Sequence, residues 1–373
     1  MIRVEYPIQI CPNYEDLYKE LFHAKIEEMQ NHWDALRQSN VSLQIFPVAL
    51  EDILLADYST LVWIYNSYGG ILPYLSNQIQ EDLKRSVFNY ELWSSDIADY
   101  FIDPSHGFKF STCHYCDTAY INAYEINVEK DALFFLNTAS NKELSSKLNT
   151  RSTKSITAYR NARPYTALTD FNKVASRLGC APNKYERTFK LHKNMKRHFD
   201  VEHVLPKSEC PLVGLSLYNF VPSCQVCNSK MKQTRVLGYF GVPMDKLSPT
   251  SPRYDFDEKV KFRLIPQIGS NLSCHPTKNP NSYVLELDAS LDSDYDYNVQ
   301  LFRLNERYNY HKMEALHWLE LKYLYTDAHL AMMANALHDS RFSAKSIKED
   351  IFQTRLDNDH HRVFGKLKKD ILE

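Results

Sequence analysis

The stretch that decides the fold runs from Asp200 to Lys232 and reads DVEHVLPKSECPLVGLSLYNFVPSCQVCNSKMK. It holds the densest group of ionisable, amide and sulfur-bearing side chains in the 373-residue chain. Pro206 follows His203 closely, and proline cannot donate a ladder hydrogen bond, so we expect a strand to end there. The pattern therefore predicts that His203 lies at the end of a strand, at the mouth of a site.

Two C-x-x-C pairs predict a metal centre. Cys113 and Cys116 form the first pair, and Cys224 and Cys227 form the second, more than 100 residues later. Each turn can point two thiolates at one ion, so the two pairs together complete a tetrahedral Zn²⁺ site. Such a closed site has no open position, so this zinc would be structural. The alternative is that the four residues are ordinary buried thiols, as we expect for the cysteines without a partner at ligand spacing: Cys11, Cys180, Cys210 and Cys274.

The residues around His203 suit hydrolysis of a phosphodiester bond. A neutral imidazole can deprotonate a water near pH 7, which makes His203 the candidate general base. The carboxylate of Glu202 and the amide of Asn228 supply the oxygen ligands that Mg²⁺ or Mn²⁺ prefers. Asn219 is expected to orient the imidazole ring through a hydrogen bond to it. Adjacent strand residues point to opposite faces, so Glu202 and His203 share a site only if the backbone twists or the ion lies near the strand edge.

The distribution of charge points to a polyanionic partner. The formal net charge is only −2, but residues 151–200 carry twelve Lys and Arg against three Asp and Glu. Residues 286–296 carry five acidic residues and no basic ones. A basic patch beside a catalytic site is expected for a nucleic-acid-binding protein. The residues predicted to contact phosphates are Lys207, Lys230, Lys232, Lys193, Lys196 and Arg197.

The rest of the chain predicts a mostly helical α+β protein with four regions. Residues 1–104 are expected to be a helical N-terminal region, with its first helix over residues 13–37. Residues 105–247 form the core around the two C-x-x-C pairs, with a basic insertion at about 130–198. Residues 248–297 are expected to be irregular with short strands, and residues 298–373 helical. The chain shows no secretory signal and no apolar run long enough for a membrane span, so we expect a cytoplasmic protein.

Four motifs carry a resemblance to a known superfamily. TCHYCD at 112–117, VEHVLPKS at 201–208, residues 211–219, and VPSCQVCNSK at 221–230 resemble the HNH (ββα-metal) endonucleases. The resemblance implies a zinc-stapled core in which a β-hairpin and a helix surround a catalytic ion. It maps the first family histidine to His203, the middle asparagine to Asn219 and the final position to Asn228. Glu202 stands where Asp is common in the family.

The flanking motifs resemble a bacterial subgroup of that superfamily. FNYE at 88–91, FRLNERYNYH at 302–311 and FGKLKKDI at 364–371 are similar to the nuclease subunit of Septu-type and retron-associated anti-phage systems. This resemblance implies an ABC/SMC-like ATPase partner, and the chain itself has no G-x-x-x-x-G-K-[ST] sequence for ATP. DNA is the favoured substrate. The alternatives are an RNA-cleaving effector, for example one that acts on tRNA, and a non-catalytic zinc-knuckle module that binds nucleic acid or a protein partner.

Overall fold

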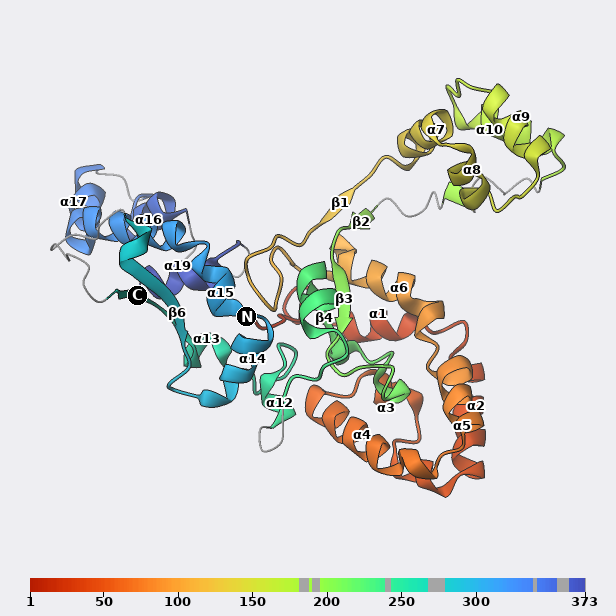
Figure 1. Ribbon diagram of the computed structural model, residues 1–373, viewed down its shortest axis with the longest axis horizontal. Helices are drawn as coiled ribbons and strands as arrows, with labels where there is room; N and C mark the ends of the chain where they lie inside the picture. Colours follow the sequence, from red (N-terminus) through yellow and green to blue (C-terminus); the bar gives the residue numbers. More distant parts are fainter. Residues whose placement is uncertain are drawn as a thin grey trace. The chain divides into compact units, whose positions relative to one another are not determined.

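The chain folds into two compact units, which Figure 1 shows in a computed structural model. Unit 1 contains Met1–Asn122 and His198–Glu373, and unit 2 contains Ala123–Arg197. Helices dominate, and the named strands form small antiparallel two-stranded sheets, as expected for the α+β class. The structure describes residues 1–180, 188–189, 195–238, 243–267, 279–337, 341–353 and 362–372.

The N-terminal region of unit 1 is helical, as predicted. Its first helix differs from the expectation, because the chain turns between α1 and α2 over residues 21–25. This turn buries Phe22 completely, with its ring 4.9 Å from that of Trp93 and 5.5 Å from that of Tyr18. The helices of the region are α1 (Tyr14–Glu20), α2 (Ile26–Ser39), α3 (Leu50–Leu54), α4 (Tyr58–Ile71), α5 (Asn77–Asp82), the π-helical η3 (Leu83–Val87) and α6 (Tyr90–Ile102).

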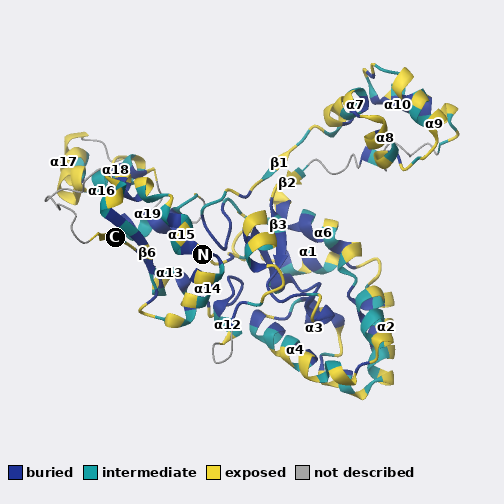
Figure 2. Ribbon diagram, viewed as in Figure 1, coloured by how far each residue is buried: buried dark blue, intermediate teal, exposed yellow. Residues whose placement is uncertain are grey.

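The stretch quoted at the outset forms a β-hairpin followed by a helical turn. Strands β3 (Asp200–His203) and β4 (Phe220–Ser223) pair antiparallel with His203 opposite Phe220, and they lie side by side in Figure 1. Both strands are mostly buried, as Figure 2 shows for β3. Pro222 is tolerated because a strand in a two-stranded sheet has an unpaired edge. The π-helix η7 (Val226–Lys232) follows directly, so the order is strand, strand, helix.

Unit 2 is the basic insertion, and it has a hydrophobic core of its own. Its two ends pair as β1 (Ala123–Glu125) and β2 (Met195–Arg197), so the unit begins earlier than the expected residue 130. Fully buried Leu136, Leu144 and Phe171 lie in the core of the helices between them. These helices are α7 (Val128–Thr138), α8 (Asn141–Lys147), α9 (Thr153–Asn161) and α10 (Leu168–Arg177).

The C-terminal half of unit 1 surrounds a second hairpin. Strands β5 (Lys261–Pro266) and β6 (Tyr283–Asp288) pair over their whole length. The predicted helical C-terminus is present, and no helix among the described residues is long and apolar enough to cross a membrane. The helices are α12 (Met244–Leu247), α13 (Phe256–Lys259), α14 (Asp296–Leu301), α15 (Leu304–Asn309), α16 (Lys312–Leu324), α17 (Asp327–Leu337), α18 (Ala344–Phe352) and α19 (Gly365–Leu372).

Candidate active site and metal centre

The two C-x-x-C pairs meet in space. The Sγ atoms of Cys113, Cys116, Cys224 and Cys227 all lie within 4.8 Å of one another. Four thiolates around one zinc at about 2.3 Å would stand about 3.8 Å apart, so the cluster is compatible with a structural Zn²⁺ site. Unit 2 enters the sequence between the pairs, which explains their long separation. The first pair lies next to the bridge between Thr112 and Tyr120, and the second spans the end of β4 and the start of η7.

Two side-chain donors, Arg307 and Thr118, contact the cysteine cluster. Arg307 of α15 donates from one guanidinium nitrogen to Cys227 Sγ at 3.2 Å and from another to Thr118 Oγ1 at 3.2 Å. Thr118 in turn donates to Cys116 Sγ at 3.2 Å. Hydrogen bonds from the other three cysteines, with help from the Arg307 charge, hold the pKa of Cys116 well below that of an ordinary thiol, whereas burial raises the pKa of Cys113. A thiolate is the form that binds zinc, so the Arg307 charge favours the metal-binding form of Cys116.

His203 is a neutral imidazole with one ring nitrogen hydrogen-bonded to the protein backbone and the other available as an acceptor. Its Nε2 lies 2.9 Å from the carbonyl oxygen of Gly214, which can only accept, so Nε2 carries the ring proton. The lone pair is therefore on Nδ1. The centre of the imidazole ring lies 4.5 Å from that of Tyr90, which it meets edge-on, and 4.8 Å from that of Phe220, whose ring is tilted against it. Burial lowers the pKa of His203 to about 3, so the ring is unprotonated at neutral pH.

Asn219 holds the loop between the strands and does not contact the imidazole directly. Its Oδ1 accepts from Leu205 N at 2.7 Å, and its Nδ2 donates to the carbonyl oxygens of Leu205 at 3.0 Å and Val213 at 2.9 Å. Val213 precedes Gly214, whose carbonyl binds the imidazole. The prediction that Asn219 orients the ring by touching it is wrong; the side chain positions the backbone that touches it.

The acidic and amide groups beside His203 form two pairs. Glu202 accepts from the Lys232 ammonium at 2.9 Å, and the same ammonium donates to the His203 carbonyl at 2.8 Å. Asn228 donates its amide to Asp200 at 3.0 Å. Burial raises the pKa of Glu202, and the nearby Lys232 charge opposes that rise. Asp200 and Glu202 are two positions apart on β3 and so point to one face.

A pocket of about 430 Å³ reaches the end of β3, and the side chains of both Glu202 and His203 line it. Glu202 and His203 are adjacent on β3, yet both reach this pocket at the end of the strand. Lys84 and Lys207 also line the pocket, and Gln233, at φ +53°, turns the chain into its wall after η7. A neighbouring hollow of about 490 Å³ shares Lys84 with it.

The predicted phosphate-contacting lysines differ in exposure. Lys230 is exposed, while Lys207 lines the pocket, pairs with Glu91 at 2.8 Å and lies 4.4 Å from the Tyr90 ring centre. Lys232 is completely buried against Glu202, so the prediction that it contacts a phosphate is wrong for this conformation. Lys193 lies outside the described residues. In unit 2, Lys196 is exposed and paired with Asp131, and Arg197 is half-buried.

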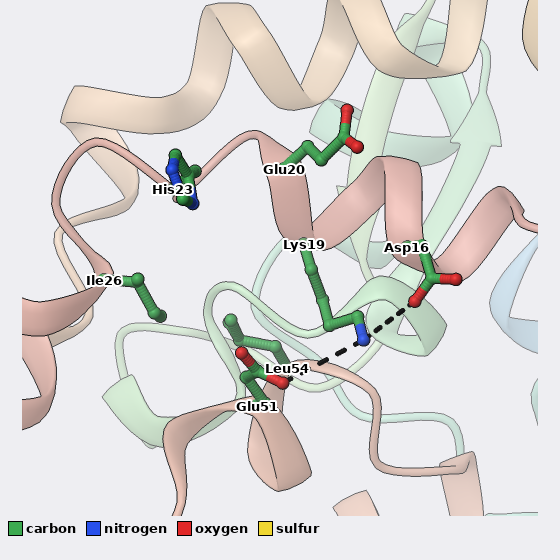
Figure 3. Close-up of a pocket in the computed structure, with 7 residues that line it drawn as sticks. All are labelled: Asp16, Lys19, Glu20, His23, Ile26, Glu51 and Leu54. Atoms are coloured by element: carbon green, nitrogen blue, oxygen red, sulfur yellow. Dashed lines mark ion pairs between the residues drawn. The ribbon is translucent and has the colours of Figure 1, made fainter.

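Two further features of the N-terminal half bear on the site. His114, inside the first C-x-x-C turn, is buried, with Nδ1 3.1 Å from the Ile2 carbonyl oxygen. Figure 3 shows a separate hollow on α1 and α3, where Lys19 lies between Asp16 and Glu51 at 2.8 and 3.9 Å. Its only lysine is therefore already paired with carboxylates, which argues against an anion site there.

Sequence reasoning missed Arg307 and Gly214, because neither lies at a spacing that signals a site. The resemblance motif at 302–311 contains Arg307, but nothing in it points to a sulfur contact. No protein-family model, curated protein or solved structure matches the chain.

Proposed function

We propose that the chain is a metal-dependent HNH endonuclease that hydrolyses phosphodiester bonds of DNA. The observation that carries the proposal is the state of His203. A neutral ring with Nε2 bound to Gly214 leaves Nδ1 free to accept a proton from water, in a pocket shared with a carboxylate. The strand–strand–helix order around it agrees with the arrangement implied by the motif resemblance.

The oxygen atoms of the side chains on and next to β3 are of the types that bind a divalent ion. Asp200, Glu202 and Asn228 offer two carboxylates and an amide oxygen, the donors that Mg²⁺ and Mn²⁺ prefer. These residues would hold the ion, which when bound would supply positive charge to stabilise the phosphate during attack. Lys232 places one cation against Glu202 at 2.9 Å, so a bound divalent ion would share this carboxylate with the ammonium.

The protein residues divide the remaining tasks. His203 takes the proton from the attacking water, and Gly214 fixes the tautomer that makes Nδ1 the base. Asn219 keeps the loop that carries Gly214 in place. Lys207 and Lys84 line the pocket and can attract the phosphate backbone. The four cysteines, with Zn²⁺ bound, hold the first C-x-x-C turn against η7.

The decisive experiment compares His203→Ala with His198→Ala in nicking of supercoiled plasmid under Mg²⁺ or Mn²⁺. His198 is exposed and lies in the same segment, so it is a matched control. We expect His203→Ala to lose about 100-fold or more in rate, with zinc content and fold retained, because general-base catalysis contributes that much. Undiminished cleavage by His203→Ala, or by wild type in EDTA, would remove the assignment.

The sequence resemblance extends this proposal to an effector of bacterial anti-phage defence that works with an ABC/SMC-like ATPase. Co-purification of the chain with the product of a neighbouring ATPase gene tests that extension. Cleavage of tRNA in preference to plasmid by the same protein would move the substrate from DNA to RNA and keep the chemistry at His203.

A further inference from the structure

The two units carry opposite charge. Unit 2 contains fifteen Lys and Arg against six Asp and Glu, a net charge of +9 within 75 residues. The rest of the chain contains 29 Lys and Arg against 40 Asp and Glu, a net charge of −11. The near-neutral total therefore hides a strongly basic folded unit, which is the usual electrostatic signature of a polyanion-binding module.

One group of basic residues in unit 2 lies on helices α8 and α9 and in the segments that follow each of them. Residues 141–163 contain six Lys and Arg and one acidic residue, Glu143. Glu143 accepts at 2.7 Å from the backbone N–H of Ser140 in the capping box of α8. Its carboxylate is therefore hydrogen-bonded at the helix start and pairs with none of these basic side chains. Arg160 donates to Asn141 at 3.3 Å, so the end of α9 lies beside the start of α8 and the two helices form one surface.

These cations point outward and are not neutralised. Leu144, Leu148 and Tyr159 turn inward to the core, which leaves exposed Lys142, Lys147, Arg151, Lys154 and Arg160 on the other side. The ion pairs of unit 2 among described residues are Lys173 with Asp170 and Lys196 with Asp131, and neither involves this surface. Mutual repulsion of like charges disfavours such a cluster in isolation, so a bound polyanion would stabilise it.

We propose that this α8–α9 surface binds the phosphate backbone of double-stranded DNA and tethers the substrate to the enzyme. The inference rests on the proposed function for the identity of the polymer. Single-strand binders stack bases on exposed aromatic rings. Beside this surface, Tyr159 and Tyr165 are buried and their hydroxyls bond within the unit, and the exposed rings of Tyr124 and Phe134 lie on β1 and α7 instead. Contacts to phosphates alone give binding with little dependence on sequence.

The experiment uses the full chain with His203→Ala, so that binding is measured without cleavage. A fluorescein-labelled 20-base-pair duplex is titrated by anisotropy at several salt concentrations without divalent ions. The test variant is Arg151→Glu with Lys154→Glu. The control is Lys25→Glu with Lys109→Glu, which changes the net charge equally at exposed positions of unit 1.

We expect the test variant to bind about tenfold or more weakly, and the salt slope of log K to fall by about one per lost phosphate contact, while the control changes far less. Equal binding by test variant and wild type would overturn the inference. Stronger binding to single-stranded DNA, to an RNA duplex or to poly-L-glutamate would also overturn the duplex assignment. Loss of binding in the variant, with a wild type that never cleaves, would support the inference and reject the proposed function instead.

Discussion

The protonation of His203 links the site to the stability of the fold. Burial lowers the pKa of the ring to about 3 in the folded chain, whereas an unfolded histidine titrates near 6.5. Below pH 6.5 the unfolded state therefore binds more protons, and folding loses about 1.4 kcal/mol for each pH unit down towards pH 3. Burial keeps the ring unprotonated at neutral pH at the cost of acid stability, and it also weakens the ring as a base, because base strength falls with the pKa.

This linkage predicts a difference between wild type and His203→Gln in acid. We expect the free energy of unfolding of wild type to fall by about 2 kcal/mol more than that of the variant between pH 6.5 and pH 5, because glutamine does not titrate. Urea unfolding followed by circular dichroism at the two pH values measures it. Parallel losses in the two proteins would show that the ring is not held neutral by burial.

Lys232 and Glu202 form a buried pair, and such pairs are costly to break. The ammonium is fully buried and has two partners, Glu202 and the His203 carbonyl. Removing one member leaves the other as an uncompensated charge, which typically costs about 3–5 kcal/mol. The exposed Lys230 on the same helix has no such role.

We therefore predict that Lys232→Met destabilises the chain by about 3–5 kcal/mol, while Lys230→Met changes stability by less than about 0.5 kcal/mol. Adding Glu202→Gln to Lys232→Met should restore a large part of the loss, because no buried charge then lacks a partner. Denaturant midpoints of five proteins provide the test: wild type, Lys232→Met, Glu202→Gln, the double variant and the Lys230→Met control. A double variant as unstable as the sum of its single changes would contradict the pairing.

At the level of elements, the loop between β3 and β4 determines where the imidazole points. Asn219 ties the loop to itself, while Tyr18 donates to the Leu215 carbonyl at 2.7 Å and Ser216 donates to the Ile53 carbonyl at 2.7 Å. Helix α1 and helix α3 thus brace the loop from the N-terminal region. A Cβ at Gly214 would lie 3.0 Å from the Pro211 carbonyl oxygen and 3.3 Å from the Lys207 Cβ, so any larger residue requires the loop to shift.

Gly214→Ala should shift the carbonyl that binds His203 and lower the cleavage rate about tenfold or more, since small misplacements of catalytic groups are costly. Gly70→Ala is the control, because nothing lies within 4 Å of the added Cβ and alanine favours a helix. Plasmid nicking and thermal unfolding of both variants measure the effect. A Gly214→Ala protein as active as Gly70→Ala would show that this carbonyl does not set the ring.

The sequence predicted these elements better than their contacts. The helical regions followed from apolar spacing, and both C-x-x-C pairs converge because their spacing suits one ion. Spacing carries no information on which side chain meets which across the fold. Lys232 was therefore expected at the surface, Asn219 on the ring, and the break between α1 and α2 was missed, because tertiary burial of Phe22 overrides the local helical pattern.

At the scale of unit 1, the cysteine cluster joins segments that are distant in the chain. The first C-x-x-C turn, η7 and α15 meet there, with Arg307 donating to Cys227 and Tyr308 donating to the Cys116 carbonyl at 2.8 Å. Asp117, directly after the turn, accepts from the backbone N–H of Lys366 at 3.0 Å and so caps α19. The cluster thereby ties the C-terminal helices to the candidate active site.

We predict one zinc per chain by mass spectrometry and faster zinc release from Arg307→Gln, because outer contacts typically contribute 10–100-fold to metal affinity. Arg303→Gln is the control, since Arg303 is exposed and pairs only locally with Glu306. Release is followed with a chromogenic chelator under mild denaturant. A protein without zinc, or equal release from both variants, would contradict the role of the cluster.

The ladder that closes unit 2 has a practical consequence. Because Glu125 pairs with Met195 across β1 and β2, the first and last residues of the insertion lie next to each other. A short hairpin turn could replace the residues between them without stretching the backbone on either side. Evolution or a protein engineer could therefore exchange this unit as a cassette and give the proposed nuclease a different choice of target.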